Sequence, residues 1–208
     1  AITIFQSGAI LGTGLAFILG GFVVSLVRHA DPIELPLFGL VYAWQLSFII
    51  VALPGFFVLL LLNTISEPSR TSNESIMQND VLQISLQDFY KSHWKTIISH
   101  HAGFAFLVLM GHAFVFWTPS FFERVHGVPA EDAAVFYGFI FIIAGAIAAI
   151  SSAKLAQIWM ARGSRESLVT IATLGTLGFI ISVGLLQFAQ NASEAFALYV
   201  PALFFLNV

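Results

Sequence analysis

The ionisable side chains that could do chemistry inside the apolar part of this sequence are histidines. Three of them share one apolar run: His100, His101 and His112. Every Asp, Glu, Lys and Arg falls outside the long apolar runs, which removes a buried carboxylate relay and a carboxylate metal site. The chain has no Cys, so it has no disulfide, thiolate nucleophile or Cys metal site. The chemistry left to the apolar runs is that of imidazole: proton exchange or a polar contact with a solute.

His101 and His112 are predicted to share one face of a helix. The helix turns about 1100° between these two positions, which is about 20° more than three full turns. The two side chains therefore project within about 20° of each other, about 16 Å apart along the helix axis. Two interpretations of His112 stay open: a structural histidine bonded to a neighbouring helix, or a contact for solute or proton in a cavity. His100 and His101 lie near one end of the run, where an interfacial position is the simpler interpretation. His101 is also a candidate for the entrance of such a cavity.

No cofactor and no metal are expected. Haem or metal ligation by His112 would need a facing histidine from a second helix, and the other apolar runs contain none. A nucleophile triad, a phosphate loop of the GxxxxGK type and an HExxH motif are absent as well. The sequence is therefore predicted not to be an enzyme.

The composition places these histidines in a membrane. Of the 208 residues, 58% are hydrophobic and 9% are charged, whereas a soluble domain carries about a quarter charged residues to cover its surface. A soluble globular protein is excluded on that ground. The net charge of -3 and the scattered basic residues also exclude a nucleic-acid interface, which leaves the lipid bilayer as the surrounding partner.

Six uncharged runs set the architecture. About 20 apolar residues cross the hydrocarbon core as a helix, and in lipid every backbone N–H and C=O must be paired within the span. We predict an all-α polytopic membrane protein with five complete spans and a truncated sixth, and we interpret both ends as truncations of a longer chain. The runs are 1–27, 35–66, 96–122, 133–153, 167–193 and 195–208.

The first run is predicted to be a tightly packed helix. Small residues let helix backbones approach closely where lipid offers no hydrophobic driving force between helices. The run contains Gly8, Gly12, Gly14, Gly20 and Gly21, and we expect Gly12 and Gly20 in particular at backbone contacts. Simple packing is the plainer interpretation of these glycines, and the lining of a solute path is the other.

Trp117, at the far end of the histidine run, also has two interpretations. With the neighbouring Phe residues it suits the headgroup level as part of an aromatic belt, and Pro119 ends or bends the helix there. Alternatively, the Trp117 ring forms a gate or stacks on a ligand.

The segment 64–95 is the one sizeable polar stretch. Its Ser, Asn, Glu and Pro content at 66–80 indicates a linker, and the apolar residues that follow recur at helical spacing. We therefore expect a short amphipathic helix at the membrane surface after the linker. The segment divides the chain into residues 1–63, 64–95 and 96–208.

Three stretches carry a family resemblance. Gly8, Gly12 and Gly14, followed by Leu19, Gly20 and Gly21, resemble the fifth helix of the major facilitator superfamily. Trp44, with Pro54, Gly55 and the exit Glu67, Pro68 and Arg70, resembles its sixth helix. A third stretch is similar to the seventh helix of the family. It contains His100, His101, Gly103, Trp117, Pro119, Phe121, Arg124 and Gly127. The chain thus looks like helices five to ten of a Spinster-like or related bacterial member.

The resemblance implies a fold and a function. The family has twelve helices in two six-helix halves joined by a long cytoplasmic loop, so 1–63 would end the N-terminal half and 96–208 would begin the C-terminal half. It implies a secondary active transporter of a small organic solute in the bacterial inner (plasma) membrane, working by alternating access with or without a coupling proton. The expected solute or proton contacts are His112, Trp117 and His101. A membrane-embedded enzyme or a cofactor-bearing respiratory subunit is the alternative.

The sequence departs from the family pattern at two places. The loop after the family's eighth helix usually carries a charge pair, but Lys154 to Ile158 contains neither the Asp nor the Arg of that pair. The fifth helix lacks the Gly-Pro pair of the antiporter signature, so antiport is not implied.

The first prediction concerns topology. Lys and Arg gather in cytoplasmic loops, and six lie on the side of 64–95 and 154–166, whereas only Arg28 and Arg124 lie on the other. Single cysteines at Ser72 and Ala130 of this Cys-free chain should therefore differ in labelling by an impermeant thiol reagent in intact cells. We expect labelling at Ala130 and none at Ser72 until the cells are opened. The reverse pattern would invert the assignment.

Overall fold

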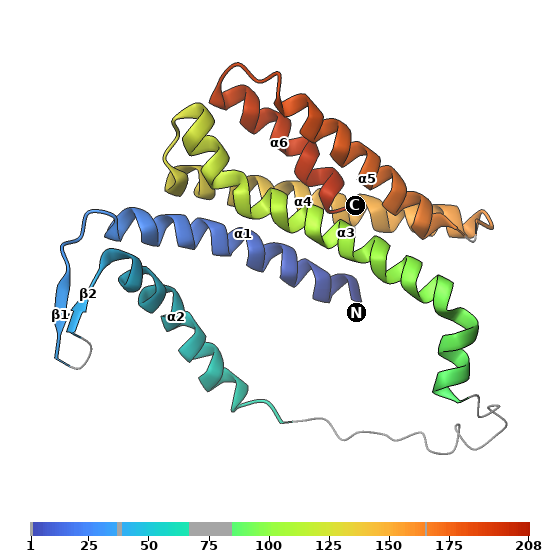
Figure 1. Ribbon diagram of the computed structural model, residues 1–208, viewed down its shortest axis with the longest axis horizontal. Helices are drawn as coiled ribbons and strands as arrows, with labels where there is room; N and C mark the ends of the chain where they lie inside the picture. The colour runs from blue at the N-terminus through green and yellow to red at the C-terminus, as the bar shows by residue number, and fades with distance from the viewer. Residues whose placement is uncertain (1, 37–38, 67–84, 165) are drawn as a thin grey trace. The chain divides into compact units, whose positions relative to one another are not determined.

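The structure is a computed structural model that describes residues 2–36, 39–66, 85–164 and 166–208. Within these residues the chain folds into six helices and one short hairpin (Figure 1). Five helices are long and apolar enough to cross a membrane, whereas α6 has only 15 residues. The predicted all-α polytopic class, with five spans and a short sixth apolar helix, is confirmed. The elements are α1 (Ile2–Val27), β1 (Ile33–Leu35), β2 (Gly39–Val41), α2 (Ala43–Leu62), α3 (Leu86–His126), α4 (Ala130–Ala161), α5 (Ser167–Leu186) and α6 (Ala192–Leu206).

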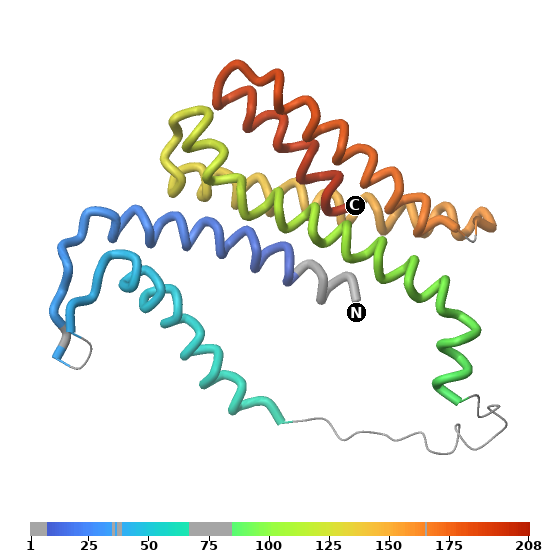
Figure 2. The backbone as a smooth tube through the Cα atoms, in the orientation of Figure 1, coloured from blue at the N-terminus to red at the C-terminus, as the bar shows by residue number. Residues whose placement is uncertain are grey.

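The chain divides into two compact units. The first unit combines Ala1–Ala52 with Ala113–Val208, and the second is Leu53–His112. The buried side chains of the described residues all belong to the first unit, which holds α1, the hairpin, α4, α5, α6 and the C-terminal turns of α3. Figure 2 follows its backbone from α4 through α5 into α6. The buried core of the described residues is therefore the core of the first unit.

α4 is the central helix of the first unit. It packs against α1 along its length and also contacts α6, while α5 packs mainly on α6. The buried positions of α4 are dominated by Ala and Gly, with Tyr137 and Phe141 as the large exceptions. Small side chains on α4 let the backbones of neighbouring helices come close, as the sequence led us to expect for tightly packed spans.

α1 and α4 run antiparallel with their backbones in close contact. A Cβ atom built at Gly14 would lie 2.9 Å from the carbonyl oxygen of Gly138, and one at Gly138 would lie 2.6 Å from that of Gly14. Gly21 and Gly145 repeat this close approach, at 2.9 Å from a side chain of α4 and 2.7 Å from a side chain of α1. Gly14 and Gly21 of α1 are seven residues apart, as are Gly138 and Gly145 of α4. Seven residues turn a helix to within about 20° of two full turns, so the two glycines of each helix lie on one face. The two helices meet glycine to glycine at Gly14 and Gly138, whereas Gly21 lies against the first turns of α4 and Gly145 lies against Ile10 of α1.

The other three glycines of α1 do not take part in this contact. Within the described chain, no heavy atom lies within 4 Å of a Cβ built at Gly8, Gly12 or Gly20. Gly12 lies about 200° around the helix from Gly14, and Gly20 lies about 100° from Gly21. The described residues therefore show no backbone contact at Gly12 or Gly20, and the expected packing of these two glycines stays a prediction. The two glycines that keep a seven-residue spacing make the backbone contact.

The hairpin between α1 and α2 was not predicted. Its strands pair antiparallel, with Ile33 opposite Val41. Gly39 has a φ of 70°, a left-handed conformation that glycine adopts without strain. Val41 is buried, whereas Ile33 and Leu40 are exposed. Strands of three residues leave too short an alternation for the sequence to reveal them.

The predicted linker 64–95 is described only in part, because residues 67–84 lie outside the described residues. The amphipathic helix that we expected there is not separate. Its described part forms the first turns of α3, which bend but continue into the span as one helix (Figure 1). The polar start and the apolar span are therefore joined without a break.

The packing of α1 on α4 predicts which glycines tolerate a methyl group. Gly14→Ala and Gly21→Ala should lower the melting temperature, because the new Cβ meets atoms of α4, at a cost of about 1–3 kcal/mol in the free energy of unfolding. Gly12→Ala and Gly20→Ala are the matched controls. They should be neutral or slightly stabilising, since Ala favours a helix and nothing described lies near them. An equal loss of stability in all four variants would contradict the seven-residue contact.

Candidate functional site

The C-terminal turns of α3 line a hollow on the first unit. Phe114, Trp117, Thr118 and Phe121 follow the spacing i, i+3, i+4 and i+7, so they share one face of the helix. The hollow has a volume of about 340 Å³ and is completed by Val183, Leu186 and Gln187 of α5 and Tyr199 of α6. Its walls are mostly aromatic and aliphatic, with no charged side chain among the lining residues. We call this hollow the aromatic pocket.

A polar centre lies inside the wall of the aromatic pocket. Thr118 has no exposed surface, and Tyr199 is 3% exposed. Thr118 Oγ1 donates to the carbonyl oxygen of Phe114 at 2.7 Å and lies 3.3 Å from the hydroxyl oxygen of Tyr199. These contacts give the hydroxyl groups the partners that buried polar atoms need. The remaining polar lining residue, Gln187, is exposed and offers both a donor and an acceptor.

An aromatic cluster holds the end of α3 against α6 and α4. The Phe122 ring is fully buried and stacks on Phe196 with a centroid distance of 3.9 Å. Tyr199 stacks on Phe114 at 4.8 Å, and Tyr137 of α4 is 6.2 Å from Tyr199. Rings of this size keep helix axes apart, and their packing gives the pocket fixed walls.

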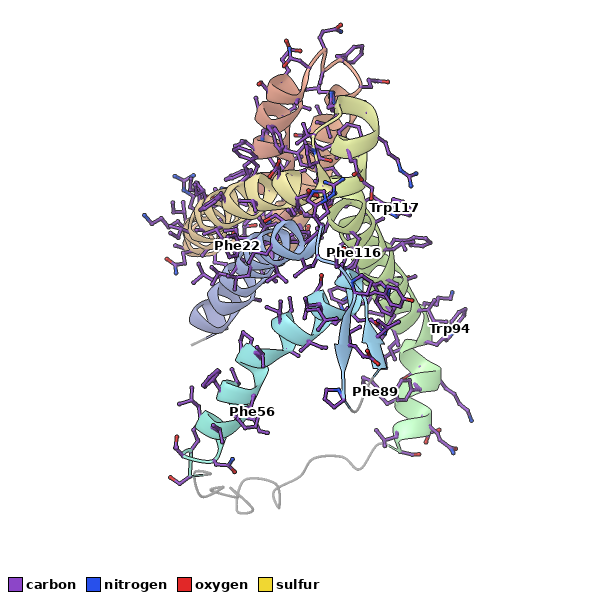
Figure 3. All side chains as sticks on the ribbon, turned by 90° about the vertical axis from the view of Figure 1, so that its left-hand side faces the viewer. Phe22, Phe56, Phe89, Trp94, Phe116 and Trp117 are labelled. Carbon is purple, nitrogen blue, oxygen red and sulfur yellow. The ribbon has the colours of Figure 1, made fainter. Side chains whose placement is uncertain are left out.

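Trp117 is the one predicted site residue that the structure places in this pocket. Its side chain is 64% exposed and points away from the helices of the first unit (Figure 3). Such a position fits either of the two interpretations given above, an aromatic belt or a ring that stacks on a ligand.

His101 and His112 belong to the second unit. The Nδ1 atom of His112 lies 2.9 Å from the carbonyl oxygen of Val108, and that of His101 lies 2.8 Å from the carbonyl oxygen of Ile97. In both pairs the ring bonds to the residue four positions earlier, which requires the hydrogen on Nδ1. The two histidines therefore make the same backbone contact on α3, and neither is a lining residue of the aromatic pocket.

An ion pair closes one end of the contact between α1 and α4. Arg28, the residue after α1, binds the carboxylate of Glu131 in the first turn of α4. The hydrogen bond to Glu131 raises the pKa of the Arg28 guanidinium above its ordinary value. Sequence analysis missed this pair because its partners are 103 residues apart and nothing local connects them.

A second hollow, of about 470 Å³, lies between α1 and the first turns of α2. Its walls are almost entirely apolar and include Gly20, Val24, Trp44 and Phe48, with Arg28 at its edge. Gly20 therefore borders open space rather than a helix. Arg28 and Ser47 are the polar residues among its lining.

These features define an integral membrane protein of packed apolar helices with a small aromatic pocket. Among the residues that the structure describes, no group of three or more His, Asp or Glu could hold a metal ion. A family model described as the Major Facilitator Superfamily matches residues 1–208, and the chain belongs to that family. No match was found among curated proteins or among solved structures. The family consists of transporters, so the chain is part of a secondary transporter of small-molecule solutes.

The polar centre of the pocket generates a prediction about stability. Thr118→Val keeps the shape of the side chain but removes the partner of the Tyr199 hydroxyl, which should cost about 1–2 kcal/mol in the free energy of unfolding. In a Tyr199→Phe background the same substitution should cost less, by at least about 0.5 kcal/mol. Thermal or denaturant unfolding of the four proteins measures this coupling. Strictly additive effects would show that the two hydroxyl groups do not interact.

Proposed function

We propose that the chain is part of a secondary active transporter that moves a small organic solute by alternating access. The observation that carries the proposal is the family match over all 208 residues. The order of the three motif stretches supports a finer placement among the Spinster-like or related bacterial members, in a bacterial inner (plasma) membrane. Nothing in the described residues favours an embedded enzyme or a respiratory subunit instead.

The contact between α1 and α4 suits a rocking mechanism. The two helices come from the two halves that the sequence predicts, 1–63 and 96–208. Alternating access moves one bundle against the other about a fixed site. Their closest backbone approach is at Gly14 and Gly138, where each glycine leaves room for the carbonyl oxygen of the opposite helix. Small residues at such a contact let two helices approach closely without large side chains between their backbones.

Two kinds of solute contact follow from the placement of the predicted residues. Trp117 and the aromatic pocket supply ring faces and a few uncharged polar groups, which suit an apolar or aromatic part of a solute. His112 and His101 supply imidazole groups on one stripe of α3, which suit a polar group or a proton. In the orientation predicted from the basic residues, Trp117 is at the outer mouth and His101 is near the cytoplasmic entrance.

The participation of His112 is testable through the pH dependence of uptake. If the ring gains and loses a proton during transport, uptake by the wild type should change between about pH 5 and 8. His112→Gln keeps a polar side chain of similar length that cannot titrate, so its profile should be flat over that interval. The measurement is uptake of a radiolabelled solute that the wild-type protein transports, at matched expression. His100→Gln, one position off the stripe, should keep the wild-type profile.

An unchanged profile in His112→Gln would remove His112 from proton exchange. A loss of folded protein in that variant, with the same profile for what remains, would assign His112 a structural role.

A further inference from the structure

The two charges of the ion pair are placed where helix ends stabilise them. Arg28 follows the last residue of α1, and Glu131 lies in the first turn of α4. A cation is favoured at a helix C-terminus and an anion at an N-terminus, because the unpaired backbone groups there carry partial charges of the opposite sign. Each residue is therefore stabilised in its charged form before the two meet.

The pair is partly open to water. The side chain of Arg28 is 45% exposed, and that of Glu131 is 11% exposed. A fully buried pair would be costly to separate, because both charges would lose their only partners. Since this one lies at the rim of the contact, water can solvate both groups when they part. The pair can therefore break and form again at modest cost.

The rest of the contact is apolar. Below the pair, Ile142 of α4 lies against Gly14 and Ile18 of α1 lies against Gly138. The Phe17 ring of α1 meets the Tyr137 ring of α4 edge-on, with their centroids 4.8 Å apart. In lipid such surfaces attract each other by close packing alone, without a hydrophobic driving force. The Arg28 to Glu131 bond is the only salt bridge found among the described residues. It is thus the one directional interaction that ties these two helix ends.

We propose that Arg28 and Glu131 form a latch that holds the outer ends of α1 and α4 together and must open when the outer face of the transporter opens. The inference rests on the proposed function, because it assigns the pair to one step of alternating access. The two residues belong to the two predicted halves, so their separation is also a separation of the halves. The predicted orientation puts both on the outer side.

A cysteine reporter tests the latch in the complete protein. Ala134 is 8% exposed, and its Cβ is 3.3 Å from a Cβ built at Gly21, so it is covered while α1 and α4 touch. With Ala134→Cys in the Cys-free chain, the rate of labelling by an impermeant maleimide in intact cells reports opening at this end. Glu131→Gln and Arg28→Gln should each raise the rate about two- to fivefold. The exchanged pair, Arg28→Glu with Glu131→Arg, should return it toward the wild-type rate.

Two controls separate the latch from weaker explanations. Asp132→Asn removes the same charge from the same turn of α4 and breaks no salt bridge, and its carboxylate acts on Arg28 only through space. It should therefore change the labelling rate much less than Glu131→Gln does. Ala148→Cys, whose parent side chain is fully buried further along α4, should stay unlabelled in every variant. If Asp132→Asn acted like Glu131→Gln, net charge would explain the effect and the latch would be overturned. Faster labelling of both reporters would mean general loosening and would overturn it as well.

The remaining outcomes also decide the matter. Equal rates in all variants, or an exchanged pair that labels as fast as the single variants, would remove the latch. Labelling only after the membrane is permeabilised would place the pair on the cytoplasmic side and contradict its role at the outer face. The assay needs no solute, so its result is separate from the uptake test. Uptake that fails while labelling behaves as expected would reject the transport proposal and leave the ion pair as a tie between the two helix ends with no role in transport.

Discussion

The structure depends on one constraint: helices in lipid gain nothing by hiding apolar surface from each other, so they hold together only where their atoms pack closely. Backbone pairing within each helix is already complete, as lipid requires. Contact between helices then depends on how near the axes can come. At α1 and α4 that distance is set by Gly14 and Gly138, whose Cα atoms leave room for the carbonyl oxygens of the opposite helix. A contact made in this way is close, and side chains such as Ile18 of α1 and Ile142 of α4 lie over the glycine of the opposite helix.

The other contact of the first unit is made in the opposite way. The end of α3 meets α6 through large rings, with Phe122 stacked on Phe196 and Phe114 stacked on Tyr199. Rings hold the helices further apart, and the space between them is partly filled, which leaves the aromatic pocket. The pocket is thus a consequence of packing by aromatic side chains, because the spacing that a ring imposes is larger than the one that a glycine imposes.

The sequence was sufficient to predict the membrane-spanning segments, but it did not predict which of them pack against each other. Five spans and a short sixth helix followed from the position of charged residues, because the cost of a charge in hydrocarbon acts on each segment separately. The glycines that make the contact did not follow, since Gly12 and Gly14 look alike in α1 until the register with Gly138 is known. Trp117 was recognised by its type, whereas its pocket needs residues of α5 and α6 that no local pattern connects to it. For the same reason the pair of Arg28 and Glu131 could not be found from sequence.

The glycine contact between α1 and α4 and the aromatic contact between α3 and α6 suit two different requirements of a transporter. A solute site must keep its shape while the protein around it changes conformation, and interlocked rings such as those around Tyr199 resist rearrangement because any shift opens a void. Under the proposed alternating access, the boundary between α1 and α4 must instead separate and close repeatedly, and the salt bridge found there among the described residues lies at its rim. α4 takes part in both, since Tyr137 lies beside the ring cluster while Gly138, the next residue, faces α1. A displacement of α1 along or away from α4 therefore acts on a helix that also supports the cluster beside the pocket, and under the proposed alternating access this helix would connect the two.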